Sequence, residues 1–419
     1  MAATQTYAGI TLPPVFLQKL IPIGELPADE LQGLNITLRH FGPGEIVFNR
    51  GEISHELVYL YEGELYLEAI NGNGYTIGAS TFKACYPIST GTEQSFTAIA
   101  KSPVKAIYLP LSLLKRSSTA AFVNNPLINP KDVPPPLRDS DFFQGFCETF
   151  RKDQLVVPSL PDVALQLRKA LKNEISVANA AKIINLDPVI SSKLIQVVNS
   201  PIYRTHKAVT NSYDAVFRLG MQTTQNLVTS VSLHQLFRSR NKRLNVRIKQ
   251  TWNQSIQVAS ISSTLASLTR KINPDEAMLG GLVHKIGTLP IIAYAESLSD
   301  KQYTEQELDQ TIALVQGLVG EFILQKWHFP TRMRQIPTLT SNWYHDASPT
   351  TLQLSDIVLL ARFHNELSGS QIQTLPPINT LPAFQKLGDN ALSPEMSLQT
   401  LADAKQQIAE TLNFFKNRT

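Results

Sequence analysis

The sequence predicts a protein of more than one domain, with a β-rich N-terminal part followed by an all-helical part. Between residues 40 and 115, short apolar runs are separated by glycine-containing turns about every eight to twelve residues, which is typical of a β-sandwich or barrel. From Asp162 onward the apolar residues recur at helical spacing instead. A proline-rich stretch that includes Pro134, Pro135 and Pro136 separates the two parts. We therefore expect a multidomain protein that contains both α and β structure.

The composition is that of a folded soluble protein. The chain has 419 residues, enough for two or three domains, with 43% hydrophobic and 17% charged residues. Two cysteines, Cys85 and Cys147, are too few for a disulfide framework. The sequence contains no apolar run long enough to cross a membrane, and its start lacks the features of a signal peptide. We expect a cytoplasmic protein that does not bind a membrane.

The N-terminal part carries a recognisable pattern of strands and turns. Apolar runs at residues 45–48 and 57–61 are accompanied by Gly44, Gly51 and Gly63. This spacing resembles the cyclic-nucleotide-binding jelly roll, and residues 26–34 resemble the entry helix of that family. The resemblance implies a β jelly roll over residues 1–122.

The residues that would bind a nucleotide in that family are replaced here. The family's phosphate-binding helix begins with Phe-Gly-Glu, and about ten residues later an Arg neutralises the cyclic phosphate. The corresponding segment here is 82–87, which has no such Glu, and Gln94 takes the Arg position. The resemblance therefore implies a degenerate regulatory or dimerising module, which would allow a homodimer. A cyclic-nucleotide-gated sensor is an alternative.

Residues 123–155 are predicted to be a proline-rich linker between the modules. Three successive prolines favour an extended polyproline II conformation. Phe142, Phe143, Phe146 and Phe150 follow closely, and we expect this aromatic segment to pack onto one of the modules.

The helical part contains several spaced signature segments. They are Val157-Pro158-Ser159-Leu160-Pro161-Asp162, then residues 184–188, 193–200, 209–220 and 320–330. Together they resemble the HDOD domain, the HD-related output domain of bacterial signalling proteins. The resemblance implies an all-α HD-like domain over residues 156–346, with a C-terminal helical extension at 347–419. It also implies bacterial signal transduction through protein–protein contacts.

The metal ligands of active HD phosphohydrolases are largely replaced in this chain. The segment His284-Lys285-Ile286-Gly287-Thr288 has a Lys where those enzymes have the metal-binding Asp. By the same resemblance, Gln254, Gln316 and Arg362 occupy other ligand positions, and only His284 is retained. Two-metal hydrolysis requires several convergent His and carboxylate ligands. We therefore expect a pseudoenzyme with no catalytic residue, bound metal or cofactor, in which His284 is a core histidine.

The alternative to a pseudoenzyme is a metal-dependent phosphohydrolase of cyclic nucleotides or dinucleotides with an unusual ligand set. The histidines available as substitute ligands are His206, His234, His345 and His364, but their spacing repeats no metal motif.

A basic segment suggests how the helical part could bind a partner. Residues 201–274 contain eleven Lys or Arg and one acid, Asp214, although the whole chain has a net charge of only +4. The densest cluster contains Arg238, Arg240, Lys242 and Arg243. Such a cluster can bind an acidic signalling protein, and the near absence of aromatic residues argues against nucleic acid. A solvated turn between helices is the other interpretation.

Helix signals occur along the whole helical part. Asp187-Pro188 marks a helix start. Trp252, Ile256 and Ala259 share one helical face with Ser263 and Ala266, and nearby serines predict close helix packing. Residues 352–367 and 397–417 are predicted to form amphipathic helices.

Overall fold

The computed structural model describes most of the chain and divides it into two compact units. The described residues are 5–10, 12–26, 28–68, 74–89, 94, 96–113, 133, 135–200, 203, 208–298, 302–346, 348, 350–367, 375–387 and 409. The N-terminal unit comprises residues 1–132, 342–352 and 366–394, and the helical unit comprises residues 133–341, 353–365 and 395–419.

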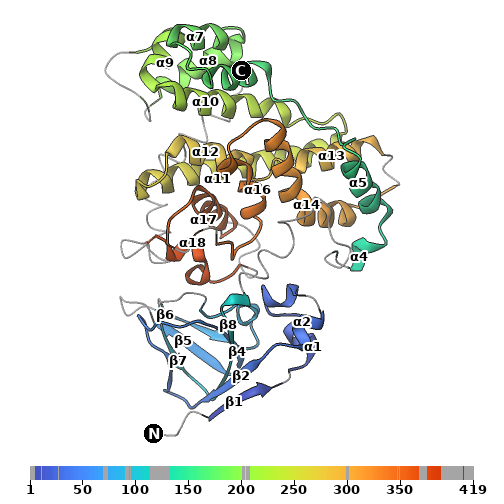
Figure 1. Cartoon of the computed structure of the whole chain (residues 1–419), viewed down its shortest axis with the longest axis vertical. Coiled ribbons are helices and arrows are strands. Elements are labelled where there is room, and N and C mark those ends of the chain that lie inside the picture. Colours follow the sequence, from blue (N-terminus) through green and yellow to red (C-terminus); the bar gives the residue numbers. More distant parts are fainter. Residues whose placement is uncertain are drawn as a thin grey trace. The chain divides into compact units, whose positions relative to one another are not determined.

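The N-terminal unit is built on two antiparallel four-stranded sheets, drawn in blue in Figure 1. Their strand orders are β1-β2-β8-β4 and β3-β7-β5-β6. The strands are β1 (Gln5–Ile10), β2 (Ile36–Phe41), β3 (Ile46–Phe48), β4 (Glu56–Glu62), β5 (Glu64–Glu68), β6 (Gly74–Gly78), β7 (Thr97–Ala100) and β8 (Val104–Pro110). The predicted β-sandwich is confirmed, and the apolar runs at 45–48 and 57–61 correspond to β3 and β4.

Strands β4 and β8 supply residues to two hydrophobic cores because successive side chains point to opposite faces of a strand. Val58, Leu60, Ala106 and Tyr108 belong to the core that includes residues of both sheets. Leu57, Tyr59, Ile107 and Leu109 belong to a second core on the opposite face. Burial on both faces explains why residues 57–60 are continuously apolar rather than alternating.

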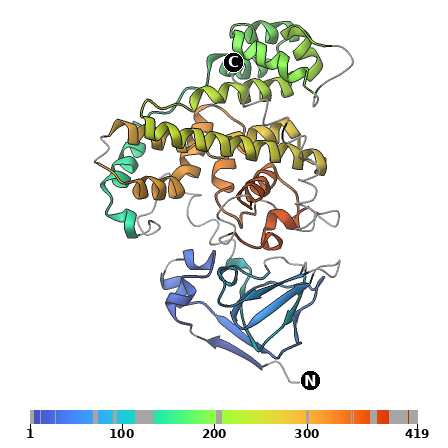
Figure 2. The ribbon, with the colours of Figure 1, turned by 180° about the vertical axis from the view of Figure 1, so that it is seen from behind.

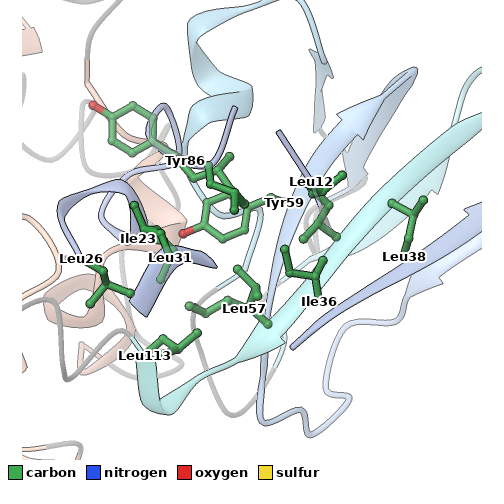
Figure 3. Packing of buried hydrophobic residues seen from close by; sticks show 14 of the residues in the cluster. Leu12, Ile23, Leu26, Leu31, Ile36, Leu38, Leu57, Tyr59, Tyr86 and Leu113 are labelled. Carbon is green, nitrogen blue, oxygen red and sulfur yellow. The ribbon is translucent and has the colours of Figure 1, made fainter. Parts of the chain in front are cut away.

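Short helices close the second core (Figure 3). These are α1 (Pro14–Leu17), the 3-10 helix η1 (Ile23–Glu25) and α2 (Ala28–Gln32), and α2 is the entry helix expected at residues 26–34. The buried Tyr59 hydroxyl donates to the carbonyl oxygen of Ile21 at 3.1 Å. Tyr344, far along the chain, is part of the same core.

In its described residues, the helical unit is built of α-helices and a short 3-10 helix that are joined by loops. Its longer helices are α5 (Asp141–Arg151), α6 (Asp162–Leu171), α7 (Val177–Ile184), α8 (Pro188–Val198), α9 (Ser212–Leu219), α10 (Met221–Leu233), α11 (Lys242–Thr269), α12 (Pro274–Val283), α13 (Thr288–Ser297), α14 (Glu305–Lys326) and α17 (Leu354–Leu367). The short elements are α4 (Pro135–Arg138), η4 (His234–Leu236), α15 (Thr331–Arg334) and α16 (Ile336–Leu339). In the N-terminal unit, η2 (Phe82–Cys85), η6 (Ile378–Thr380) and α18 (Pro382–Gln385) complete the described elements.

The local helix signals in the sequence are confirmed. The Asp187 carboxylate accepts hydrogen bonds from the backbone amides of Val189 and Ile190, at 2.8 and 3.1 Å, and so caps α8. Helices α11 and α12 lie side by side (Figures 1 and 2), and a Cβ on Gly281 would come within 2.4 Å of the Ala259 backbone. This contact is the close helix packing that the serines and small residues of α11 predict.

The predicted linker and C-terminal extension are not separate units in the structure. The aromatic segment forms α5, where Phe142 packs against Tyr294 and Tyr303 and Phe150 against Phe322. It was expected to pack onto one of the modules, and that module is the helical unit. Pro135 and Pro136 begin α4 rather than extending a polyproline segment, since proline is well tolerated in the first turn of a helix. Most of the linker at 123–134 lies outside the described residues.

The C-terminal part contributes to both units, which differs from the predicted boundaries 156–346 and 347–419. Residues 353–365 belong to the helical unit, whereas the described residues 375–387 belong to the N-terminal unit. Helix α17 is buried continuously from Leu354 to Ala361, so it is a core helix and not the amphipathic helix predicted at 352–367. The helix predicted at 397–417 lies almost wholly outside the described residues.

Within the described part of the chain, one helical segment is long and apolar enough to span a membrane. It covers Pro274–Ser297, and 83% of its apolar window is buried within the structure. Core helices of soluble proteins can be equally long and apolar, so this is weak evidence for a membrane span.

Candidate functional site

The HD-site positions (residues 254, 284, 285, 316 and 362) are organised around the turn between α12 and α13. Asn273 caps α12 through hydrogen bonds from the amides of Asp275 and Glu276, and His284 follows the last residue of this helix. The turn reaches Gly287, where a Cβ would lie 1.9 Å from the carbonyl oxygen of Gln316 on α14. Glycine is therefore required for the turn to contact α14 this closely.

His284 is buried and neutral. Its side chain is only 2% exposed, and Nδ1 lies 2.6 Å from the Gly281 carbonyl oxygen. A carbonyl only accepts, so Nδ1 carries the proton and Nε2 has the lone pair. Nε2 is buried and has no hydrogen-bond partner among the described residues. Burial, helped by the Lys285 ammonium, lowers the pKa of His284 to about 3.

Lys285 and Gln254 hydrogen-bond to each other. The Lys285 ammonium donates to the Gln254 side-chain oxygen at 2.9 Å, joining α11 to the turn. Both residues stand at positions where active HD enzymes place a metal ligand, so the structure brings these two positions together as the resemblance implies. At these two positions, the Lys285 ammonium is hydrogen-bonded to the Gln254 side-chain amide.

The remaining two positions are also engaged with their surroundings. The Gln316 amide nitrogen donates to the Ser341 hydroxyl at 3.0 Å, while its buried oxygen lacks a partner among the described residues. The Arg362 guanidinium, from α17, donates to the Thr340 carbonyl oxygen. Arg362 also contributes to lowering the pKa of His284, which places a second cation near that imidazole.

These residues do not fit a divalent metal ion. His284 Nε2 is a competent donor atom, but the ammonium of Lys285 and the guanidinium of Arg362 are donors of protons, not of lone pairs. They also repel a cation through space. Among the described residues, no group of three or more His, Cys, Asp or Glu side chains could hold a metal ion.

The described histidines that were considered as substitute ligands do not form a metal site with His284. His364 is buried and burial lowers its pKa to about 4. His234 lies against Trp252, with ring centroids 5.2 Å apart, and burial together with Arg238 and Lys193 lowers its pKa. His345 belongs to the N-terminal unit, and His206 lies outside the described residues.

The basic cluster is partly neutralised by acids that follow it in sequence. Arg243 pairs with Glu305 at 3.0 Å, and Arg247 pairs with both Glu305 and Asp309. The Glu296 carboxylate accepts from the backbone amides of Arg240 and Asn241, at 2.7 and 3.0 Å. Sequence reasoning missed these three acids because they lie on α13 and α14, more than fifty residues away.

What remains of the cluster is a smaller exposed surface. The side chains of Arg238, Arg240 and Lys242 are exposed, and no described acid pairs with them. We call these three residues the basic patch.

The nucleotide-anchor positions of the N-terminal unit are occupied by other interactions. The segment at 82–85 forms the short 3-10 helix η2. Gln94 is only 2% exposed, and its side-chain oxygen accepts a hydrogen bond from the Ser89 hydroxyl. Residues 90–93 and 95 lie outside the described residues.

Comparison with known proteins gives one family match, to the HDOD domain at residues 157–342. An uncharacterised protein of Treponema pallidum (strain Nichols) is 25% identical over 189 residues, which are 42% of this chain and 35% of that protein. The match thus spans about a third of that relative.

Solved structures also resemble the two parts of the chain. A Shewanella amazonensis SB2B protein, provisionally described as a metal-dependent phosphohydrolase, has 26% identity and a TM-score of 0.56, covering 64% of this chain and 97% of its own. A Geobacter metallireducens GS-15 protein, provisionally described as cyclic nucleotide-binding, covers 26% of this chain and 83% of its own, with 15% identity and a TM-score of 0.22.

The match at 157–342 agrees closely with the HD-like domain expected from the spaced signatures. It also contains four of the five HD-site positions, 254, 284, 285 and 316, while Arg362 lies beyond it. Residues 157–342 of this chain form an HDOD domain.

Proposed function

We propose that this chain is a non-catalytic signalling protein of the bacterial cytoplasm, whose HDOD domain acts by binding other proteins. The observation that carries the proposal is the hydrogen bond from Lys285 to Gln254. It joins two positions that carry metal ligands in active HD enzymes, and it places a cation and an amide where a metal would need ligands. The N-terminal β unit acts in this scheme as a degenerate regulatory module.

The basic patch is the surface that we assign to partner binding. An exposed group of cations attracts an acidic partner and accelerates its encounter in a salt-dependent way. The ion pairs of Arg243 and Arg247 with α14 hold the start of α11, where Lys242 lies. Arg238 and Arg240 lie in the segment before α11, where the Glu296 carboxylate accepts a hydrogen bond from the Arg240 amide.

A turnover assay tests the absence of catalysis. Wild-type protein, Lys285→Asp and the double variant Gln254→His with Lys285→Asp are assayed with cyclic mono- and dinucleotides in the presence of Mg²⁺, Mn²⁺ or Fe²⁺. We expect no turnover from any of the three proteins, because Gln316 and Arg362 still supply no ligand. Metal-dependent turnover by wild type that disappears in His284→Ala would overturn the proposal.

The alternative function is a metal-dependent phosphohydrolase. The observation in its favour is the similarity to the Shewanella amazonensis protein provisionally described in those words. That similarity shows a shared fold, and the description belongs to the other protein. In this chain, Lys285 and Arg362 place positive charges at two ligand positions, which argues against a metal-dependent activity. The same assay separates the two functions.

A further inference from the structure

A pocket of about 450 Å³ lies within the helical unit, at a place that the HD-site positions do not reach. It is lined by residues of α6, α10, α12 and α15 and by the segment 328–330 that follows α14. Neither His284 nor Lys285 nor Gln254 is among the lining residues. The volume falls in the range of small-molecule sites, which is about 300–1,000 Å³.

Arg168 lines this pocket as a buried cation without a carboxylate partner. It is 7% exposed and lies on the buried face of α6 with Ala164 and Leu167. Its guanidinium carbon is 3.7 Å from the centroid of the Phe329 ring, and Nη2 makes only a long contact of 3.4 Å to the Thr229 hydroxyl. Nε has no partner, and no described acid forms an ion pair with this side chain.

An unpaired buried charge is costly, and such groups normally pair or shift toward the neutral form. Burial lowers the pKa of Arg168 to about 10, which leaves the guanidinium charged at neutral pH. A bound anion would supply the missing partner.

Asn226 is a second buried donor without an acceptor in the same pocket. It lies on α10 and is 4% exposed. Its side-chain oxygen accepts from Gln222 at 3.3 Å, whereas Nδ2 has no hydrogen-bond partner among the described residues. Buried donors are nearly always satisfied, so two of them at one pocket indicate a ligand that carries acceptors.

The charge around the pocket has the sign that an anion requires. Lys172 and Arg332 line it together with Arg168, and the only acid among the lining residues is Glu276. Glu276 already pairs with Arg332 at 2.7 Å. Arg168 and Lys172 therefore remain as positive charge not balanced within the lining.

The end of α14 holds Phe329 under Arg168. The amide of Phe329 donates to the Leu324 carbonyl at 3.0 Å, and the amide of His328 to the Gln325 carbonyl at 2.9 Å. This pair of bonds is a Schellman motif, with His328 at φ 57° in the left-handed position that glycine usually takes. A histidine in this conformation is strained, and such strain tends to occur at binding sites.

We propose that this pocket binds a small organic phosphate, with Arg168 and Asn226 donating to the phosphoryl oxygens. A phosphate suits the site better than a carboxylate because donors converge from α6 and α10 and because two positive charges remain. Arginine is the side chain best shaped to bind phosphoryl oxygens in a pair of hydrogen bonds.

Thermal unfolding and calorimetry with inorganic phosphate and pyrophosphate as probes test this proposal on the full chain at constant ionic strength. We expect both probes to bind wild type and to raise its melting temperature with concentration. Arg168→Met should weaken binding by roughly thirtyfold or more, as expected when one partner of a buried charged hydrogen bond is removed. Its melting temperature without phosphate should equal or exceed that of wild type, because an unpaired charge has been removed.

The matched control is Lys169→Met, which makes the same change of charge at the next, exposed residue of α6 and should bind both probes like wild type. Absence of binding to wild type, or equal binding by wild type and Arg168→Met, overturns the proposal. If Arg168→Met does not fold, Asn226→Asp decides, because a carboxylate there repels the anion. Phosphate binding retained by that variant would also overturn the proposal.

Discussion

By the HDOD resemblance, His284 is the HD ligand position that still has its histidine, and its imidazole is buried. Its Nδ1 proton is bound by the Gly281 carbonyl, and the ring fills a buried position at the end of α12. The sequence-based expectation of a core histidine with one hydrogen bond agrees with this geometry. A metal site would instead direct several lone pairs toward a common point.

Burial of His284 predicts a pH dependence of stability. The folded-state pKa of about 3 lies below the ordinary value of 6.5, so the unfolded chain takes up a proton that the folded chain does not. The contribution of His284 to the free energy of unfolding is therefore fully present above about pH 6.5. It decreases by about 1.4 kcal/mol per pH unit as the pH falls toward 3. Urea unfolding measured from pH 7 to pH 5 should show at least this slope, because burial also lowers the pKa values of His234 and His364.

The variant His284→Asn isolates that contribution, because its amide can still donate to the Gly281 carbonyl. Between about pH 6 and pH 5, we expect the free energy of unfolding of the variant to change with pH by about 1.4 kcal/mol per pH unit less than that of wild type, which corresponds to one proton. An unchanged slope would mean that other groups cause the pH dependence.

Arg168 and Asn226 were not singled out from the sequence, although one signal was present. Arg168 follows Leu167 on the same stripe as Ala164 and Leu171, where a helix that packs on one face normally has apolar residues. A single arginine on such a stripe usually reaches solvent with its charged end. Only the packing of α6 against α10 reveals that this one does not.

At the scale of elements, glycines determine how the helices of the HDOD domain meet. Gly281 allows α12 to contact α11, and Gly287 allows the turn after α12 to contact α14. The sequence predicted the helices and their close packing from local signals. It did not predict that Glu296, Glu305 and Asp309 would partly neutralise the basic cluster, because those contacts depend on how α13 and α14 fold back toward α11.

Gly287→Ala should therefore destabilise the helical unit. The new Cβ would lie 1.9 Å from the Gln316 carbonyl, and backbone must move to admit it. We expect a loss toward the upper end of the roughly 1–3 kcal/mol typical of overpacking, measured by urea unfolding. Gly42→Ala, whose Cβ would lie no closer than 3.6 Å to another atom, is the control and should be nearly neutral.

At the scale of the whole molecule, the two fold types were predictable but the boundaries were not. Short apolar runs separated by glycine turns indicated the β unit, and apolar residues at helical spacing indicated the helical unit. No local pattern indicates that Tyr344 belongs to the second core of the β unit, or that residues 353–365 belong to the helical unit. Tyr344 packs against Tyr86, more than two hundred residues earlier, and residues 353–365 pack against α12, more than seventy residues earlier, so both assignments depend on contacts between distant segments.

The docking role of the basic patch is tested by charge reversal. Arg238→Glu with Arg240→Glu and Lys242→Glu should weaken partner capture from a bacterial lysate, most strongly at low salt, because the attraction is screened by ions. The fold should be retained, since these side chains are exposed and pair with no described acid.

The matched control reverses three exposed lysines elsewhere on the same domain, Lys169, Lys182 and Lys271, and changes the net charge equally. If both triple variants lose the partners to the same extent, the effect is one of net charge and the patch has no specific role.

The most direct test of a metal-free HD site is the metal content of the protein itself. Wild type and His284→Ala are incubated with Mn²⁺, Fe²⁺ or Mg²⁺, freed of unbound ions by gel filtration and analysed by mass spectrometry of the elements. We predict far less than one bound ion per chain for both proteins, because Lys285 and Arg362 place positive charge where ligands would be needed. One or more ions per chain in wild type, lost in His284→Ala, would contradict the account.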